Sequence, residues 1–315
     1  MKKSKKIIIN HEKIYDLIII GAGPAGISAA IYAKRAMLSV LMFEEDLIGG
    51  KLNKTGDIEN YTGFKSIKGS SLSKMMEEQL LSFNFKIENK KIRSLKKEKD
   101  VFIAKTDNDE TFFSKSTIIS TGTIERKLEI EGEKELTNSG VSYCAVCDGF
   151  LFKDKDVLVI GGGYSGCESA NYLSNIARKV YLVHHGKELK VDLRLKEIIN
   201  SNKKIEIFLE SEIIKIIGNK KVESSIILIN KDIEKEINVS GVFPCIGLIP
   251  NSQLVEELEV CDSAKYILVN ENCSTKINGL FSAGDVNKKR NRQIATAVSD
   301  GVIASQSAIS YLNSL

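Results

Sequence analysis

Gly-Ala-Gly-Pro-Ala-Gly, residues 21–26, is the stretch that decides the fold of this chain. It follows an apolar, β-branched run at 15–20 and opens an alanine-rich helical stretch, after which a second apolar run, 40–43, ends at Glu44. Glycines in this pattern allow a tight strand-to-helix turn and a close backbone approach to a pyrophosphate at the helix N-terminus. A carboxylate at the end of the second strand can accept hydrogen bonds from ribose hydroxyls. The pattern therefore predicts a dinucleotide-binding βαβ unit whose site residues are Gly21, Gly23, Pro24, Ala25, Gly26 and Glu44.

The same pattern returns in the middle of the chain. An apolar run at 157–160 leads into Gly-Gly-Gly-Tyr-Ser-Gly at 161–166, a helix through Leu173 and a strand at 180–183. Short strands are expected around 91–120 and, after the second unit, at 205–209, 213–217 and 224–230. The sequence thus predicts an α/β protein with two Rossmann-like dinucleotide-binding domains. The second site would use Gly161, Gly163, Tyr164, Ser165 and Gly166.

His184 and His185 end the second strand of this later unit. At that position they could lie near a nucleotide ribose, but histidines exposed at a strand end are the expectation we favour.

Length and composition are those of a globular protein with two domains. A chain of 315 residues exceeds the roughly 100 to 200 residues of one domain, and 43% hydrophobic and 27% charged residues are ordinary values. The net charge of +4 comes from 45 basic and 41 acidic residues in mixed sequence, which does not indicate nucleic-acid binding. The apolar run within 1–10 is far shorter than a signal peptide or a membrane span requires. We therefore expect neither export nor a membrane location.

Cys144-Ala145-Val146-Cys147-Asp148 is the predicted chemical centre. Two thiols separated by two small residues can close a disulfide, and at a helix start one thiol ionises near neutral pH. Half of a structural zinc site is the alternative, but no second Cys-x-x-Cys or His-x-x-x-His completes it, and we predict no metal site. Six cysteines are too few for a disulfide scaffold, which favours a reducing compartment, the cytoplasm. The single cysteines are expected to be small buried hydrophobes: Cys167, Cys245, Cys261 and Cys273.

The last part of the chain contains a strand that runs into Gly284-Asp285. An aspartate in this position faces the ribityl and pyrophosphate region in flavoproteins, although it can also be an ordinary helix cap. The basic residues of 288–292 could contact a pyrophosphate, and a solvated loop is an equal alternative. Apolar spacing over 293–312 predicts a C-terminal helix that is broken or hinged at Gly301.

Taken together, these motifs make the chain similar to the low-molecular-weight bacterial thioredoxin reductases, nearly end to end. The resemblance is carried by GAGPAG, by a Cys-x-x-Cys just before the second glycine motif, by GGGYSG and by the SAGD segment at 282–285. Further matches are 49–52, 58–61, 120–122, 243–251 and 292–297.

The resemblance implies an FAD domain made of residues 1–122 and 248–315, with a pyridine-nucleotide domain, 123–247, inserted between them. The inserted domain would carry the disulfide, and the hinges would lie near 123–127 and 244–247. It also implies a homodimer, NADPH as electron donor and thioredoxin or a thioredoxin-like protein as partner.

Roles for individual residues also come from the resemblance. Cys147 would be the thiol near the flavin, Cys144 the thiol that attacks the partner disulfide, and Asp148 the acid that protonates the leaving thiolate. Beyond the first glycine motif, the implied FAD contacts are Gly50, Lys51, Leu52, Asn60, Thr121, Gly122, Gly284, Asp285, Arg292, Gln293 and Ile294. The implied nucleotide contacts beyond the second motif are His184, His185 and Lys190.

One departure from the family concerns the electron donor. The arginines that pair with the 2'-phosphate of NADPH in the family are replaced here by His185 and Gly186, and Lys187 and Lys190 offer point charges instead of a bidentate fork. No acidic residue that would favour NADH ends the strand either. NADH, flavodoxin or ferredoxin therefore remain alternative donors, and a non-catalytic dinucleotide sensor or zinc protein remains an alternative of another class.

Overall fold

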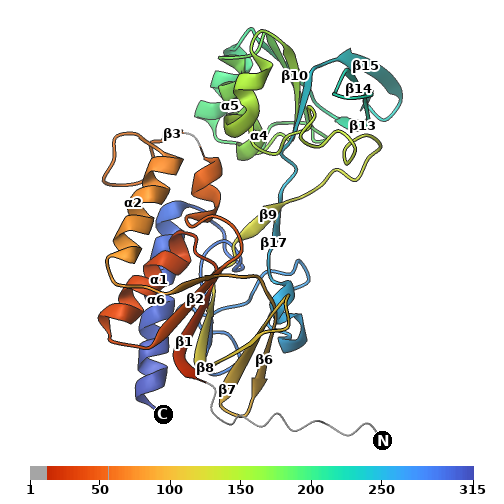
Figure 1. Cartoon of the computed structure of the whole chain (residues 1–315). Helices are drawn as coiled ribbons and strands as arrows, with labels where there is room; N and C mark the ends of the chain where they lie inside the picture. Colours follow the sequence, from red (N-terminus) through yellow and green to blue (C-terminus); the bar gives the residue numbers. More distant parts are fainter. Residues whose placement is uncertain (1–12, 56) are drawn as a thin grey trace, which may run out of the picture. The chain divides into compact units, whose positions relative to one another are not determined.

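The computed structural model describes residues 13–55 and 57–315, apart from the side chain of Cys147. The chain forms two compact units (Figure 1). The first comprises the described residues up to Asn53 together with Asp57–Ile124 and Pro250–Leu315, and the second is formed mainly by Glu125–Ile249. The second unit is thus inserted into the sequence of the first, which confirms the predicted fold class. The segment 1–10, for which no export signal is predicted, lies outside the described residues.

The first unit is built on a seven-stranded sheet with the order β5-β2-β1-β8-β7-β6, and β18 also pairs with β8. The strands β5, β2, β1, β8 and β18 are mutually parallel, whereas β6 and β7 add antiparallel pairs. Their bounds are β1 Ile14–Ile20, β2 Val40–Glu44, β5 Ile87–Asn89, β6 Ile92–Glu98, β7 Val101–Thr106, β8 Thr111–Ile119 and β18 Leu280–Ser282. The other elements are α1 Pro24–Arg35, η1 Gly50–Lys54, β3 Asp57–Ile58, β4 Ile67–Lys68, α2 Gly69–Leu81, η3 Gln253–Leu258 and α6 Ile294–Asn313.

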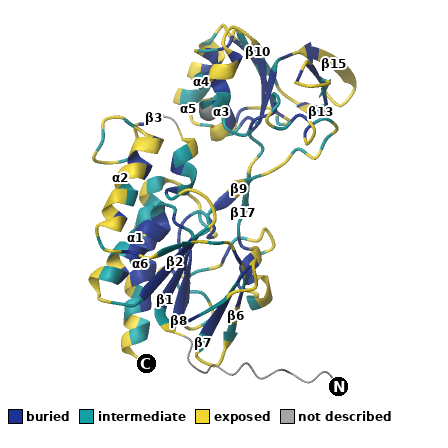
Figure 2. Cartoon of the chain, viewed as in Figure 1, coloured by how far each residue is buried: buried dark blue, intermediate teal, exposed yellow. Residues whose placement is uncertain are grey.

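The central strand β1 is apolar because both of its faces are covered. Leu17 and Ile19 pack into the core beneath α1 and α6, while Ile18 and Ile20 pack into the core on the opposite face. All four side chains are buried, and Figure 2 shows β1 largely in the dark blue of buried residues. A strand in a parallel sheet that is covered on both faces reads as a continuous apolar run, which explains the stretch 17–20.

The C-terminal helix α6 is continuous through Gly301, so the predicted break at this residue is wrong. Gly301 is buried, and a Cβ at this position would lie 2.1 Å from the carbonyl oxygen of Ala25 in α1. The two helices lie side by side (Figure 1). The glycine therefore allows close helix packing and does not serve as a hinge.

The second unit contains a parallel sheet of order β12-β11-β10-β16 and an antiparallel sheet of order β13-β14-β15. The strands are β10 Asp156–Ile160, β11 Lys179–Val183, β12 Ile205–Phe208, β13 Ser211–Ile217, β14 Ser224–Ile229, β15 Ile233–Asn238 and β16 Gly241–Pro244. The helices are α3 Ala145–Asp148, η2 Gly149–Phe152, α4 Tyr164–Ser174 and α5 Leu193–Ser201. The predicted strand–glycine–helix–strand unit of this region is confirmed, with bounds shifted by a residue or two.

The chain passes between the units at 124/125 and at 249/250. The two crossing segments, β9 (Thr123–Glu125) and β17 (Leu248–Pro250), pair as a two-stranded sheet. The assignment of cofactors to the two domains, and of hinges to these segments, stays a prediction. Among the described residues, no helix combines the length and apolar character needed to cross a bilayer.

The packing of α1 against α6 yields a first prediction. Gly301→Ala should lower the free energy of unfolding by about 1–3 kcal/mol, because the added methyl group overpacks a tight interface. In an unobstructed helix the same change would stabilise by about 0.5–1 kcal/mol. Urea unfolding measures the difference, with Ser299→Ala, an exposed position of the same helix, as the control. A stabilised Gly301→Ala variant would contradict the close packing.

Candidate functional site

The first glycine motif forms the turn between β1 and α1. Gly21 has φ +103°, and a Cβ there would lie 2.4 Å from the carbonyl oxygen of Ser120; a Cβ on Gly26 would lie 1.9 Å from that of Gly21. Beside Gly23, by contrast, a Cβ would meet no atom of the described residues within 4 Å. Pro24 is the first residue of α1, and the first turn carries no acidic side chain. This helix end therefore fits a pyrophosphate, with space beside its middle glycine.

Glu44 is held by the backbone around it. One carboxylate oxygen accepts the N–H of Ala22 at 2.7 Å, and the other accepts those of Glu45 and Asp46 at 2.9 and 3.0 Å. A carboxylate offers about four acceptor positions, so capacity for a further donor remains. Glu44, which is predicted to bind a ribose, thus has a second role, because it joins the end of β2 to the glycine turn.

Two more predicted segments lie in the same unit. Gly50 and Lys51 begin η1, and the Lys51 ammonium donates to the Thr123 hydroxyl at 2.7 Å.

The Thr121 hydroxyl donates to the carbonyl of Asn251 at 2.5 Å, and Gly122 adopts φ +65°. The apolar side chains of Leu52 and Ile294 pack in one small cluster.

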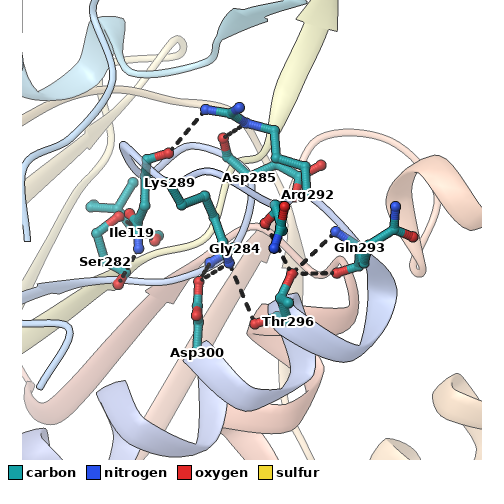
Figure 3. Close-up of polar contacts among 11 residues, drawn as sticks. Ile119, Ser282, Gly284, Asp285, Lys289, Arg292, Gln293, Thr296 and Asp300 are labelled. Carbon is teal, nitrogen blue, oxygen red and sulfur yellow. Dashed lines mark hydrogen bonds and ion pairs between the residues drawn. The ribbon is translucent and has the colours of Figure 1, made fainter. Parts of the chain in front are cut away.

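Gly284 is held by Asp300, which the sequence did not single out, and Asp300 in turn binds Lys289 of the basic segment 288–292 (Figure 3). The N–H of Gly284 donates to a carboxylate oxygen of Asp300 at 2.9 Å, and Lys289 donates to the same oxygen at 2.6 Å. Both charged side chains are largely buried, at 15% and 18% exposure, so the pair is not a solvated surface contact. Spacing offers a signal for Asp300, which follows buried Ala297 by three positions and so belongs to the same helix face.

Asp285 is half-buried, and burial raises the pKa of its carboxyl, against opposing effects of Lys51, Lys289 and Arg292. The Arg292 side chain donates to the carbonyls of Asp285 at 3.2 Å and Asn287 at 3.3 Å, and its guanidinium lies 4.2 Å from the ring centroid of Tyr266. The basic segment 288–292 is therefore only partly solvated.

Gln293 caps α6 through reciprocal hydrogen bonds with Thr296 (Figure 3). Its side-chain oxygen also accepts from the Asn60 amide at 3.2 Å. The structure thus brings together two predicted FAD contacts that are far apart in sequence.

The second glycine motif repeats the geometry of the first. A Cβ on Gly161 would lie 2.2 Å from the carbonyl oxygen of Cys245, and one on Gly166 would lie 1.8 Å from that of Gly161. Beside Gly163 the space is again open among the described residues. Tyr164 and Ser165 are exposed in the first turn of α4, and the Tyr164 hydroxyl donates to Asp192 at 3.0 Å.

The two histidines after β11 differ in environment. His185 is exposed as expected, but the expectation is wrong for His184, whose side chain is only 4% exposed. Ideal Cβ atoms at Gly162 and Gly186 would lie 2.5 and 2.7 Å from its ring, so the two glycines make room for it. The pKa of His184 is lowered because burial disfavours the charged ring. Lys190 is exposed, and its backbone N–H donates to the carbonyl of Gly162 at 2.7 Å.

Cys144 precedes the short helix α3 and is disulfide-bonded. The side chain of Cys147 lies outside the described part, so its pairing with Cys144 stays a prediction. The Ser142 hydroxyl accepts the N–H of Cys144 at 3.1 Å and donates to Asp148 at 2.5 Å. Ser142, which sequence reasoning missed, therefore positions the predicted acid.

The remaining cysteines are free thiols: Cys167, Cys245, Cys261 and Cys273. Burial raises the pKa of Cys167 to about 11 and that of Cys273 to about 12, so both are inert at neutral pH. Among the described residues, no group of three or more acidic, histidine or cysteine side chains is arranged to hold a metal ion.

The chain is similar to known proteins over nearly its whole length. The family described as pyridine nucleotide-disulphide oxidoreductase matches residues 15–301. The thioredoxin reductases of Bacillus subtilis and Mycoplasma genitalium are each 40% identical to it, over 98% and 96% of this chain and 98% and 97% of theirs.

Solved structures show the same similarity. Lactococcus lactis thioredoxin reductase is 38% identical, with coverage of 96% of this chain and 100% of that one and a TM-score of 0.91. A ferredoxin-flavin thioredoxin reductase from Clostridium acetobutylicum is 34% identical, with coverage of 96% and 98% and a TM-score of 0.54.

The hydrogen bonds of Glu44 yield a prediction. Glu44→Ala should lower the free energy of unfolding of the cofactor-free protein by about 1–3 kcal/mol, because the buried amide of Ala22 loses its partner. Denaturant unfolding after removal of any bound cofactor measures this loss. Glu45→Ala is the matched control, because it removes only an exposed ion pair with Lys91, worth about 0–1 kcal/mol. Equal losses in the two variants would contradict the role of Glu44 in fixing the turn.

Proposed function

We propose an electron route for this protein on the premise that the chain belongs to the pyridine nucleotide-disulphide oxidoreductase family. The protein is a flavin-dependent oxidoreductase that reduces a disulfide of thioredoxin. Electrons pass from a reduced pyridine nucleotide, through FAD, to the disulfide of Cys144 and Cys147, and then to the partner. The observation that carries this proposal is the combination of two matching glycine turns with the disulfide-bonded Cys144 in the inserted unit.

The first unit is the FAD domain in this proposal. The open space beside Gly23, the acid-free first turn of α1 and the remaining acceptor capacity of Glu44 fit the pyrophosphate and ribose of FAD. Asp285, Arg292 and the segments around Lys51 and Thr121 supply the further polar groups. When bound, the flavin accepts a hydride and returns the electron pair to a disulfide.

The cysteines and Asp148 carry out the exchange with thioredoxin. The Cys144 thiolate attacks the partner disulfide, which gives a mixed disulfide and releases one partner thiolate. Cys147 then attacks the Cys144 sulfur, which re-forms the internal disulfide and releases the second partner thiolate. Asp148, held by Ser142, supplies a proton to a leaving thiolate. A homodimer in the cytoplasm is part of the same proposal, by family resemblance and by the free thiols of the other cysteines.

The donor is the least conventional part of the proposal. Because the stretch after β11 offers histidines and lysines where the family has arginines, NADPH should remain a usable donor but should lose the preference over NADH that those arginines provide. The open turn at Gly163 supports retained pyrophosphate binding. A second candidate, reduction by ferredoxin, is favoured by the missing arginines and by the similarity to a ferredoxin-flavin thioredoxin reductase.

The two thiol roles can be tested by substitution. Cys144→Ser and Cys147→Ser should each abolish thioredoxin reduction while FAD stays bound, because either change prevents the internal disulfide. Cys144→Ser should retain a thiolate beside the flavin and show a long-wavelength flavin–thiolate absorption band that Cys147→Ser lacks. Absorption spectra and FAD content measure both effects, and Cys167→Ser, which changes a buried inert thiol, is the control. A band in Cys147→Ser alone would reverse the two roles.

The donor can be tested by anaerobic titration of the flavin with NADPH, NADH and reduced ferredoxin. Loss of two arginine contacts, at about 1.5–3 kcal/mol each, predicts a loss of NADPH affinity of about a hundredfold or more relative to proteins that have them. His185→Arg should recover about tenfold in kcat/KM with NADPH and leave NADH unchanged, and His185→Gln is the control. Gly186→Arg is a poorer test, because its Cβ would lie 2.7 Å from the ring of His184.

Strong NADPH selectivity of the unmodified protein would mean that Lys187, Lys190 or Arg194 supplies the missing charge. Bleaching by ferredoxin alone would favour the second candidate.

A further inference from the structure

The second unit contains a small hollow at the carboxyl ends of its parallel strands. Its volume is about 190 Å³, below the roughly 300–1,000 Å³ typical of pockets that enclose a whole small-molecule ligand. It therefore suits one part of a dinucleotide. Its lining includes Ile160, Gly161, Val183, His184, Ser211 and Glu212.

The hollow lies where a nucleotide bound at the second glycine turn would place its adenosine ribose. In a βαβ unit the pyrophosphate lies at the helix N-terminus and the ribose near the end of the second strand. Gly161 begins the glycine turn, and His184 directly follows β11. This assignment rests on the proposed function, in which the second turn binds the nucleotide donor.

Glu212 reaches this strand end from a different sheet. The N–H of Ser211 donates to the carbonyl of His184 at 3.0 Å, which holds the start of β13 against the end of β11. The Glu212 side chain is exposed, and within the described part of the chain its carboxylate has no hydrogen-bond or ion-pair partner. No lysine or arginine is among the described residues that line the hollow; Lys187 and Lys190 do not line it.

His184 adds an unpartnered polar group. Its ring is 4% exposed, and neither ring nitrogen has a hydrogen-bond partner among the described residues. Burial and the charges of His185 and Lys190 lower the pKa of this ring, and the backbone of Glu188 raises it by a smaller amount. The net lowering favours the neutral ring. A neutral imidazole offers one donor and one acceptor, which matches a hydroxyl, whereas a phosphate dianion offers acceptors only.

We infer that Glu212 and His184 form a binding site for a ribose diol, and that Glu212 makes the protein select NADH over NADPH. The carboxylate accepts hydrogen bonds from the 2'- and 3'-hydroxyls of NADH. With NADPH it faces a 2'-phosphate of like charge, and no arginine or lysine of the lining offsets the repulsion. The acid missing from the end of β11 is thus supplied by the first residues of β13.

The experiment measures binding of NAD⁺ and NADP⁺ to the oxidised holoenzyme by calorimetry, because neither reacts with oxidised flavin. The unmodified protein should bind NAD⁺ at least about tenfold more tightly, equivalent to about 1.4 kcal/mol. Glu212→Gln should remove about tenfold of this preference, and Glu212→Lys should reverse it. The control is Glu234→Gln on β15, which removes the same charge in the same cross-strand row, two strands away and outside the hollow.

Tighter binding of NADP⁺ by the unmodified protein, or a ratio unchanged by Glu212→Gln, would overturn the inference and leave the proposed function intact. Equal changes in the Glu212 and Glu234 variants would also overturn it, because they would reflect net charge only. If neither nucleotide binds, both the inference and the proposed nucleotide donor fail. Reduction of thioredoxin by the dithionite-reduced holoenzyme then reports separately whether the disulfide chemistry stands.

Discussion

The close backbone approach within each glycine turn is the constraint on which both units depend. A Cβ on the last glycine of each motif would lie too close to the carbonyl oxygen of the first glycine. The distance would be 1.9 Å for Gly26 and 1.8 Å for Gly166. The residue that follows a neighbouring strand also crowds the first glycine: a Cβ there would lie 2.4 Å from the carbonyl oxygen of Ser120 after β8, or 2.2 Å from that of Cys245 after β16. Each turn is thus confined from two directions, so the helix can start only in one place relative to the strands. Among the described residues, only the middle glycine has open space beside it, and this space adjoins a helix N-terminus that fits an anionic group.

Much of this architecture is predictable because it depends on residues close in sequence. The strand at Ile14–Ile20 and its counterpart at Asp156–Ile160 are apolar on both faces, and each runs directly into its glycine turn.

Gly301 shows where such prediction fails. Its neighbours in sequence have helical spacing and the glycine alone suggested an interruption, whereas the reason for a glycine is the carbonyl of Ala25, a residue remote in sequence. The burial of His184 is unpredictable for the same reason, since the space it fills is left by Gly162 and Gly186.

The candidate site shows a similar division. The glycines, Glu44 and Asp285 can be found from motifs, but the groups that hold them in place come from elsewhere in the chain. Asp300, within α6, accepts from both Gly284 and Lys289, and no motif links these three residues. Glu212 belongs to a strand that begins beyond the second βαβ unit, and only the hydrogen bond of Ser211 to His184 brings it to the end of β11. A search for an acid confined to the strand end itself therefore misses it.

The packing of His184 between two glycines also limits how this protein can change over time. A Cβ at position 186 would lie 2.7 Å from the imidazole of His184, so an arginine there requires the ring to move. The two positions are thus epistatic, and the order of substitutions matters. An arginine introduced at 186 with His184 unchanged crowds the imidazole, so the ring has to shift before the new charge can bring its full benefit.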